Sequence, residues 1–168
     1  KNRYEGCEIK LAGDGSSMSA EIGYVAAGKE RLDMNYCVRH TGKKTECAIN
    51  AAGALRDTAF KLFRGTIDFV KGSAGSVGNE KEEVLLIDEK CVNQTIPIIL
   101  CAEEDVVGNH GATIGKPDEE LLFYLESRGI PAQECYNMLA AAKLLAVCGK
   151  IPDDGIRNEI HDYIKEVY

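Results

Sequence analysis

The stretch that decides the fold reads Leu32-Asp33-Met34-Asn35-Tyr36-Cys37-Val38. Apolar side chains alternate in it with mostly polar ones, and this period of two residues predicts a β-strand with one buried face. The pattern recurs at Ile22/Tyr24, Cys47/Ile49 and Ile67/Phe69. The region from Cys7 to about Gly115 is therefore predicted to consist of short strands.

Two continuous apolar runs, 84–87 and 96–101, predict strands that are buried on both faces. The strand-like runs recur every ~10–15 residues, a spacing that fits a sandwich, a barrel or a β-solenoid. Tight hairpin signals are rare, Asp14-Gly15 being the clearest, and this disfavours a hairpin-rich sandwich. Because the region has no strict repeat motif, periodicity alone permits a solenoid without selecting it.

After Gly115 the apolar period lengthens to three and four residues, which predicts helices. Three are expected, at about 117–128, 131–149 and 153–167. The first is expected to dock on the end of the β region, with Leu121 and Leu125 facing inward. A long β region followed by segregated helices indicates an α+β order.

The composition narrows the class of partner. The chain has 168 residues and a formal net charge of −7, so both nucleic acid and anionic membrane are disfavoured as partners. No apolar stretch reaches the ~20 residues that cross a bilayer, and the first residues do not resemble a signal peptide.

The chain has seven cysteines, an odd number, and no Cys-x-x-Cys pair. This argues against a disulfide framework and a structural zinc site, and predicts a cytoplasmic protein with reduced thiols. The glycine-rich segment 72–78 is not followed by the Lys-Ser/Thr pair of a phosphate-binding loop, so any ATP hydrolysis is expected in a partner.

Four ordered motifs carry a family resemblance. They read Phe63-Arg64-Gly65-Thr66-Ile67, Val84-Leu85-Leu86-Ile87-Asp88-Glu89-Lys90-Cys91, His110-Gly111-Ala112-Thr113-Ile114-Gly115 and Leu122-Phe123-Tyr124-Leu125-Glu126-Ser127-Arg128-Gly129-Ile130. In this order they resemble the closing stretch of the SufB/SufD family, scaffolds on which iron–sulfur clusters are assembled. The resemblance is ordered over roughly residues 58–148.

The resemblance implies a mainly β fold, a right-handed parallel β-helix followed by a small C-terminal helical subdomain. It divides the chain into 1–115, holding only the C-terminal rungs of the β-helix, and 116–168, holding about three helices. It also implies that the chain is part of a longer protein. A shortened β-helix would expose apolar stacking surface, which favours dimerisation or aggregation.

Two candidate site residues follow. Cys91 comes after Asp88-Glu89-Lys90 at the polar end of a strand, where Lys90 favours the thiolate and the acidic residues oppose it. His110 is expected in an accessible polar turn between strand and helix, and imidazole is a good iron ligand. The resemblance implies a sulfur-accepting or cluster-ligating role for Cys91 and a cluster- or metal-ligating role for His110.

The resemblance also implies partners. SufB is expected to supply the cysteine and SufD the histidine across a heterodimer. One chain carrying both suggests a homodimer, with a SufB/SufD-type heterodimer as the alternative. The implied cofactor is a transient iron–sulfur cluster, fed by a sulfur donor protein, with flavin as a further candidate of the complex. An ABC-type ATPase related to SufC is expected on the helices, at Phe123, Tyr124 and Arg128.

In the SufB pattern a glutamate follows the histidine, and its carboxylate is a further candidate ligand. In this chain Gly111 follows His110, so that carboxylate is missing. Residues 103–105, two glutamates and an aspartate, are candidates to replace it. Of the other thiols, Cys47, Cys101, Cys135 and Cys148 are expected in packed positions. His40 and His161 are expected to be satisfied structural histidines.

Two other functions remain open at this point. In the first, Cys91 is a nucleophile and His110 its base, as in cysteine hydrolases, rather than a non-enzymatic scaffold. In the second, the chain is a β-solenoid interaction module that holds no cofactor.

Overall fold

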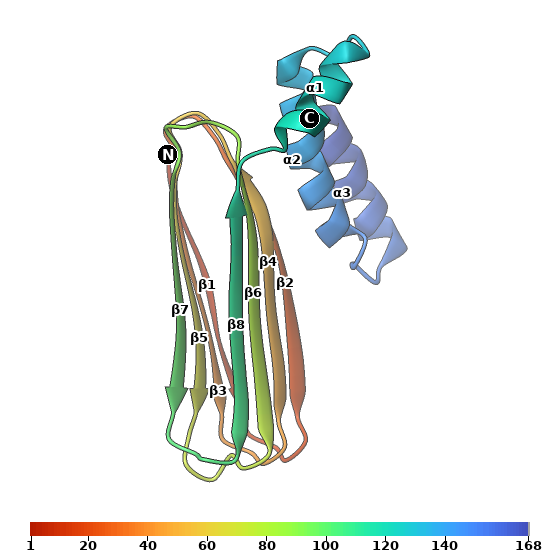
Figure 1. Cartoon of the computed structure of the whole chain (residues 1–168). Coiled ribbons are helices and arrows are strands. Elements are labelled where there is room, and N and C mark those ends of the chain that lie inside the picture. The colour runs from red at the N-terminus through yellow and green to blue at the C-terminus, as the bar shows by residue number, and fades with distance from the viewer. Residues whose placement is uncertain (168) are drawn as a thin grey trace.

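The computed structural model describes residues 1–167 and contains eight strands followed by three helices (Figure 1). The strands are β1 (Asn2–Leu11), β2 (Ser17–Ala26), β3 (Arg31–His40), β4 (Glu46–Leu55), β5 (Phe60–Phe69), β6 (Ser76–Leu86), β7 (Val92–Cys101) and β8 (Val106–Gly115). The helices are α1 (Glu119–Ser127), α2 (Ala132–Cys148) and α3 (Asp154–Val167).

Successive strands alternate between two parallel sheets, in the orders β1-β3-β5-β7 and β2-β4-β6-β8. One strand from each sheet makes a rung, and the chain forms a β-solenoid of four rungs. Arg31 pairs with Asn2 on one side and with Phe60 on the other, so that each rung adds about 30 residues. The backbone therefore repeats, although the sequence has no repeat motif. A rung requires only that its inward side chains be apolar, and many sequences meet that requirement.

The core lies between the two sheets. Inward side chains stack in register from rung to rung, as in Leu32, Met34 and Val38 of β3, which are all buried. The alternation predicted from the sequence is confirmed in β2, β4 and β5, where Tyr24 and Ile49 belong to the same core. The mainly β architecture with C-terminal helices is therefore as expected.

Two local predictions are wrong. The run 96–101 forms β7, but Ile96 and Leu100 are exposed, because they point outward from the β1-β3-β5-β7 sheet and the helices cover the other sheet. His110 does not lie in a turn between strand and helix. It is in the middle of β8, since ladder pairing with β6 extends the strand as far as Gly115.

The turns at one end of the solenoid are tied together by aspartates. The carboxylate of Asp57 accepts a hydrogen bond from the Gly28 N–H at 2.7 Å, and that of Asp88 accepts one from the Asp57 N–H at 2.6 Å. Each carboxylate satisfies a backbone donor one rung below its own. The aspartate of the 84–91 motif therefore has a structural explanation.

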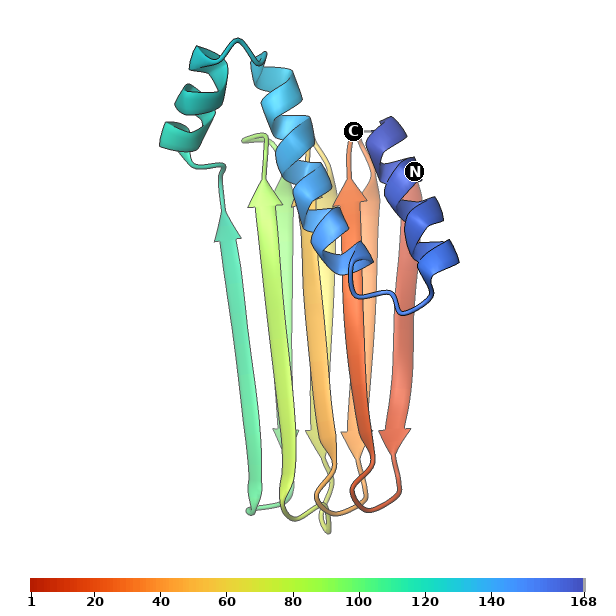
Figure 2. The same cartoon turned by 90° about the vertical axis from the view of Figure 1, so that its right-hand side faces the viewer.

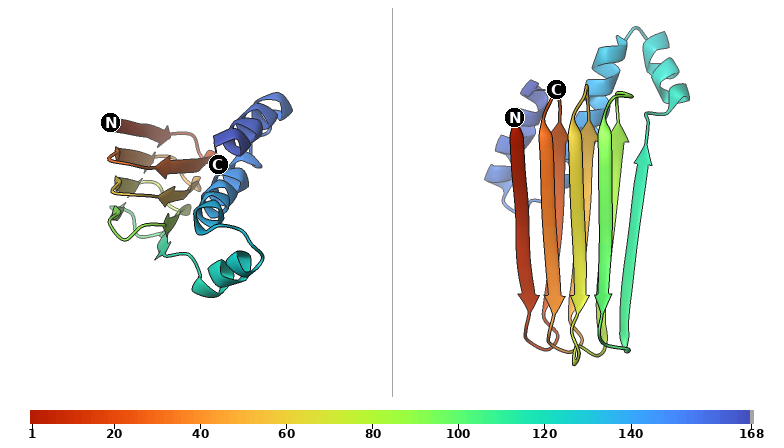
Figure 3. Two further views of the ribbon diagram at one scale, coloured as in Figure 1. Left: turned by 90° about the horizontal axis from the view of Figure 1, so that it is seen from above. Right: turned by 90° about the vertical axis from the view of Figure 1, so that its left-hand side faces the viewer.

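Helix α2 packs on the outer face of the β2-β4-β6-β8 sheet, beside β2 and β4 (Figure 2). All three helices lie on that side of the solenoid, as the view from above shows (Figure 3). Val147 and Leu144 of α2 lie against Gly23 of β2, where an added Cβ would be 3.4 Å from the Val147 side chain, an ordinary packing distance. Lys143 pairs with Glu83 at 2.9 Å and fixes the helix along the sheet.

The expected docking of the first helix on the end of the β region is wrong. Asp118 caps α1, accepting from the N–H groups of Glu120 and Leu121, but α1 has no buried residue and packs against α2. Leu121 is exposed and Leu125 is half-buried. The last rung is consequently left open. No helix in residues 1–167 is long and apolar enough to span a membrane.

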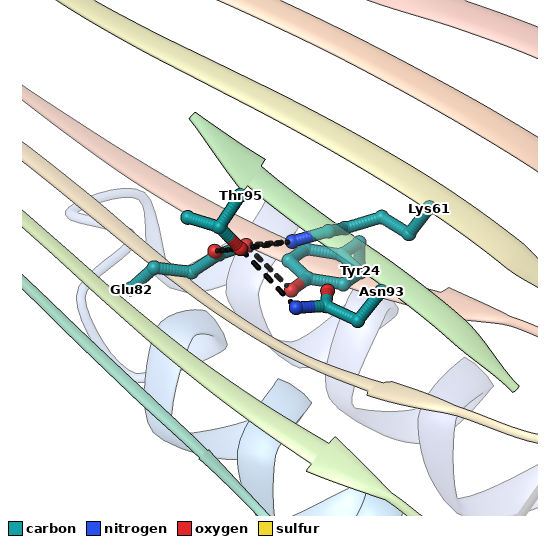
Figure 4. Close-up of polar contacts among 5 residues, drawn as sticks. All are labelled: Tyr24, Lys61, Glu82, Asn93 and Thr95. Atoms are coloured by element: carbon teal, nitrogen blue, oxygen red, sulfur yellow. Dashed lines mark hydrogen bonds and ion pairs between the residues drawn. The ribbon is translucent and has the colours of Figure 1, made fainter. Parts of the chain in front are cut away.

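One buried charged network crosses the core (Figure 4). The carboxylate of Glu82 pairs with Lys61 and accepts hydrogen bonds from the Tyr24 hydroxyl at 2.9 Å and from the Thr95 hydroxyl at 2.5 Å. Glu82 and Lys61 are fully buried. Burial lowers the pKa of Lys61, and the nearby Glu82 opposes that shift.

Tyr24 reaches this network from two rungs away. It lies in β2, and its ring passes Gly53 of β4 to meet Glu82 of β6. Any side chain at Gly53 would collide with the backbone and ring of Tyr24. Burial and Glu82 together raise the pKa of the Tyr24 hydroxyl far above its usual range, so it remains a hydrogen-bond donor.

We expect Lys61→Met to lower the free energy of unfolding by about 3–5 kcal/mol, because it leaves Glu82 buried without its counter-charge. Urea denaturation followed by circular dichroism measures this. The matched control is Lys116→Met, which breaks the exposed pair with Glu89 and should cost less than about 1 kcal/mol. Equal effects of the two substitutions would contradict the role assigned to the buried pair.

Candidate functional site at the open rung

The last rung, made by β7 and β8, is an open surface. Each strand pairs on one side only, with β5 and with β6, so the other edge presents unpaired backbone groups. Large apolar side chains are exposed along both strands: Val92, Ile96, Leu100, Val107 and Ile114. An edge of this kind is suited to contact with another chain.

His110 lies at the centre of this surface, on the inner face of β8. In the ladder its partner is Glu80 of β6, whose side chain is buried between the sheets. Gly108, two residues earlier, faces Phe69 and Ile99 across the core, so residues 108, 110 and 112 share the inward direction. The imidazole is nevertheless exposed, because no further rung covers it.

Glu80 lies directly below His110 in the stack. It is 4% exposed, and one of its carboxylate oxygens, Oε2, is buried without a hydrogen-bond partner among residues 1–167. Burial and the neighbouring Glu82 raise the pKa of Glu80 to about 7, while Lys61 opposes the shift. A hydrogen bond of 3.0 Å between the outward side chains of Asn109 and Asn79 holds the two strands in this register.

Gly65 makes the space that Glu80 occupies. A Cβ at this position of β5 would lie 2.5 Å from the carboxyl carbon of Glu80, too close for any side chain. Gly65 belongs to the 63–67 motif of the sequence. The glycine of that motif therefore has a physical role, which is to admit a carboxylate to the centre of the core.

Cys91 lies elsewhere, in the turn before β7. Its thiol is half-buried against the core and donates to the backbone carbonyl of Asp57 at 3.8 Å. Burial raises the pKa of Cys91, a backbone hydrogen bond at Asp88 opposes the shift, and the charges of Asp88 and Asp57 add to it. The expected help from Lys90 is thus outweighed, and the thiol form is favoured at neutral pH.

The structure does not bring Cys91 and His110 together within one chain. The turn that holds Cys91 is level with the end of β8, where Lys116 pairs with Glu89 at 3.0 Å. His110 is five residues before Gly115, which at a strand rise of about 3.3 Å per residue separates them by roughly 16 Å. A nucleophile and its base must be within hydrogen-bond reach, so this pair does not form the cysteine-hydrolase arrangement.

The carboxylates at 103–105 lie in the turn between β7 and β8. The carboxylate of Glu103 accepts a hydrogen bond from the Gly72 N–H at 2.8 Å and so has a structural partner in that turn. Among residues 1–167 there is no group of three or more His, Cys, Asp or Glu side chains that could hold a metal ion. The acidic residue paired with His110 in the ladder is Glu80, which the sequence did not single out. The sequence held no signal for it, because residues 79–83 are all polar or charged and no apolar alternation marks which of them face inward.

The remaining cysteines and histidines divide as follows. Cys47, Cys135 and Cys148 are buried as expected, whereas Cys101 is exposed because it lies on the open rung. His40 is a satisfied structural histidine, with its ring nitrogens 2.7 Å from the Thr45 hydroxyl and 3.2 Å from the Cys47 sulfur.

The residues expected to bind an ATPase are exposed on α1. Phe123 is 73% exposed and Tyr124 52%. The guanidinium of Arg128 lies 5.0 Å from the centre of the Tyr124 ring, a stacked arrangement that orders both side chains.

Fold and site together define a class: a parallel β-solenoid with helices on one flank and an open last rung that carries a histidine above a buried glutamate. The family model described as "SUF system FeS cluster assembly, SufBD core domain" matches residues 1–143. The chain belongs to the SufB/SufD family of iron–sulfur cluster assembly proteins.

Several relatives are similar over most of the chain. The iron–sulfur cluster assembly protein SufD of Bacillus subtilis is 29% identical over 155 residues, which are 92% of this chain and 36% of the relative. SufB of the same organism is 28% identical over 82% of this chain and 29% of the relative. A SufBD family protein of Mycobacterium leprae is 30% identical over 67% of this chain and 13% of the relative. The chain thus spans about a third of SufD and less of the others.

Proposed function

We propose that this chain acts as a scaffold component of a SUF-type assembly complex in the cytoplasm, and that a transient iron–sulfur cluster binds at the open rung through His110. The single observation that carries this is the position of His110, an exposed imidazole in the middle of a surface with unpaired edges. Imidazole is a good ligand for iron. The cluster is cargo that is built and passed on, so an exposed position suits the role.

Cys91 has a separate part in the proposal. Its distance from His110 excludes a cluster held by both residues of one chain. Cys91 instead accepts sulfur: its thiolate attacks the outer sulfur of a donor protein's persulfide, forming the Cys91 persulfide and releasing the donor thiolate. Since burial and carboxylates favour the thiol here, the donor has to supply a base or a positive charge when it docks.

A second SufB/SufD-type chain is proposed to cover the open rung. The exposed apolar side chains of β7 and β8 and the unpaired strand edges favour this. An identical copy is sufficient, because each chain carries both Cys91 and His110. Pairing would also enclose His110, which protects a cluster from water and supplies ligands from the second chain.

The helices are proposed to bind the ATPase that drives the cycle. An apolar ring at Phe123 and an aromatic–guanidinium pair at Tyr124 and Arg128 have the composition of a protein interface. Because α1 packs against α2 and α2 packs on β2 and β4, a movement of α1 on ATPase binding would be transmitted through α2 to the solenoid.

Anaerobic incubation of the chain with Fe²⁺ and sulfide should produce visible absorption that His110→Ala reduces severalfold. His161→Ala, at a histidine of α3, is the matched control and should leave it unchanged. Cys91→Ala should retain the absorption, because free sulfide bypasses the persulfide, but should lose transfer of labelled sulfur from a persulfide donor. Equal absorption in His110→Ala and in the unmodified chain would contradict the proposed site.

The purified chain should behave as a dimer in light scattering at micromolar concentration. Val107→Lys places a charge on the open rung and should shift the mass to that of a monomer. Tyr4→Lys, at an exposed side chain of β1, should not. A monodisperse monomer before any substitution counts against pairing through this rung.

Phe123→Ser should weaken binding to a SufC-type ATPase by about tenfold or more, as expected when an exposed aromatic anchor is truncated. Titration calorimetry measures the affinity. Tyr163→Ser, at an exposed aromatic of α3, serves as the control. Loss of binding with Tyr163→Ser and not with Phe123→Ser would move the docking surface from α1 to α3.

A further inference from the structure

Glu80 is in an unusual state for a buried carboxylate. Its neighbour Glu82, two residues on, has Lys61, Tyr24 and Thr95 as partners. Glu80 has no such set, and its Oε2 is buried without a partner. A buried polar group left unpaired costs about 1–3 kcal/mol, and more if it is charged. The fold nevertheless makes room for it, because Gly65 leaves the space beside its carboxyl carbon.

The position of the carboxylate links it to the open rung. Glu80 and His110 are ladder partners on adjacent parallel strands, which lie about 4.8 Å apart. Both side chains project into the same interior, Glu80 in the third rung and His110 in the fourth. The imidazole is open to solvent and the carboxylate is enclosed below it. An ion entering from the open rung would meet the imidazole first and the carboxylate next.

We propose that Glu80 and His110 together bind a single Fe²⁺ ion, the iron that is delivered for cluster assembly. This rests on the proposed function for the nature of the cargo. Mixed imidazole and carboxylate ligands suit ferrous iron, and a divalent cation would satisfy the carboxylate oxygen that has no partner. Among residues 1–167 no third His, Cys, Asp or Glu side chain joins these two in a group that could hold a metal ion. In this proposal water therefore supplies the remaining ligands, and the ion is held loosely enough to be passed on.

The alternatives for Glu80 are weaker. It forms no ion pair with Lys61, which is paired to Glu82, and its Oε2 does not act as a cap for a backbone donor. A purely structural inward position would be filled with less cost by an apolar residue, as at Val84 in the same strand. The combination of an open imidazole and an enclosed unpaired carboxylate is what binding of a cation explains.

The test measures Fe²⁺ binding to the 168-residue chain by anaerobic calorimetry, with no sulfide present. Glu80→Gln keeps the shape of the side chain and removes its charge, and we expect it to weaken Fe²⁺ binding by at least about tenfold. His110→Ala should have a comparable effect. The matched controls are Glu89→Gln, at an exposed carboxylate, and His161→Ala, and both should bind as the unmodified chain does.

A second measurement does not depend on affinity alone. Co²⁺, used in place of Fe²⁺, should give visible absorption bands and paramagnetically shifted imidazole signals in proton magnetic resonance. His110→Ala should lose the shifted signals, and Glu80→Gln should change the absorption bands even where Co²⁺ is saturating. Circular dichroism of each variant confirms that the solenoid is folded, and Glu80→Asp, which retains a carboxylate, should recover part of the binding.

Two results would overturn the inference: Fe²⁺ affinity that is the same in Glu80→Gln as in the unmodified chain, or an unmodified chain that takes up no Fe²⁺. Neither result decides the proposed function, which depends on cluster absorption in the presence of sulfide. Conversely, a chain that binds Fe²⁺ through both residues but forms no cluster would retain the iron site and exclude the scaffold role.

Discussion

The structure depends on the in-register stacking of parallel rungs. Each inward position lies on the corresponding position of the rung before it, so a side chain is buried only when another rung follows. This constraint explains why chemically similar strands differ in exposure. Residues of β3 and β5 are enclosed on both sides, whereas equivalent residues of β7 and β8 are open because the stack ends there.

The same constraint concentrates the chemistry at one end. Stacking puts His110 over Glu80, and the unpaired edge leaves the imidazole exposed while the carboxylate is buried in the rung below. In the same strand and rung as Glu80, Glu82 is paired by Lys61, Tyr24 and Thr95. Two glutamates that are two residues apart in one strand thus differ: Glu82 is paired and stabilises the core, whereas Glu80 keeps a carboxylate oxygen without a partner among residues 1–167.

The helices leave this end uncovered. α2 packs along the outer face of the β2-β4-β6-β8 sheet, with Val147 against Gly23 and Lys143 paired to Glu83. α1 then projects with Phe123 and Tyr124 exposed. One chain therefore presents two separate exposed apolar surfaces, the last rung and helix α1, and these are the two surfaces proposed above for a sibling chain and for an ATPase.

The sequence by itself determined the strands and helices, because alternation at positions such as Leu32 and Met34 and the longer period after Gly115 report local burial. Its ordered motifs also indicated the family and drew attention to His110. Only the tertiary structure decided that His110 lies in a strand and not a turn, that Cys91 is far from it, and that Glu80 is its neighbour. Residues 80 and 110 are a full rung apart in the chain, and only the stacking register makes them adjacent.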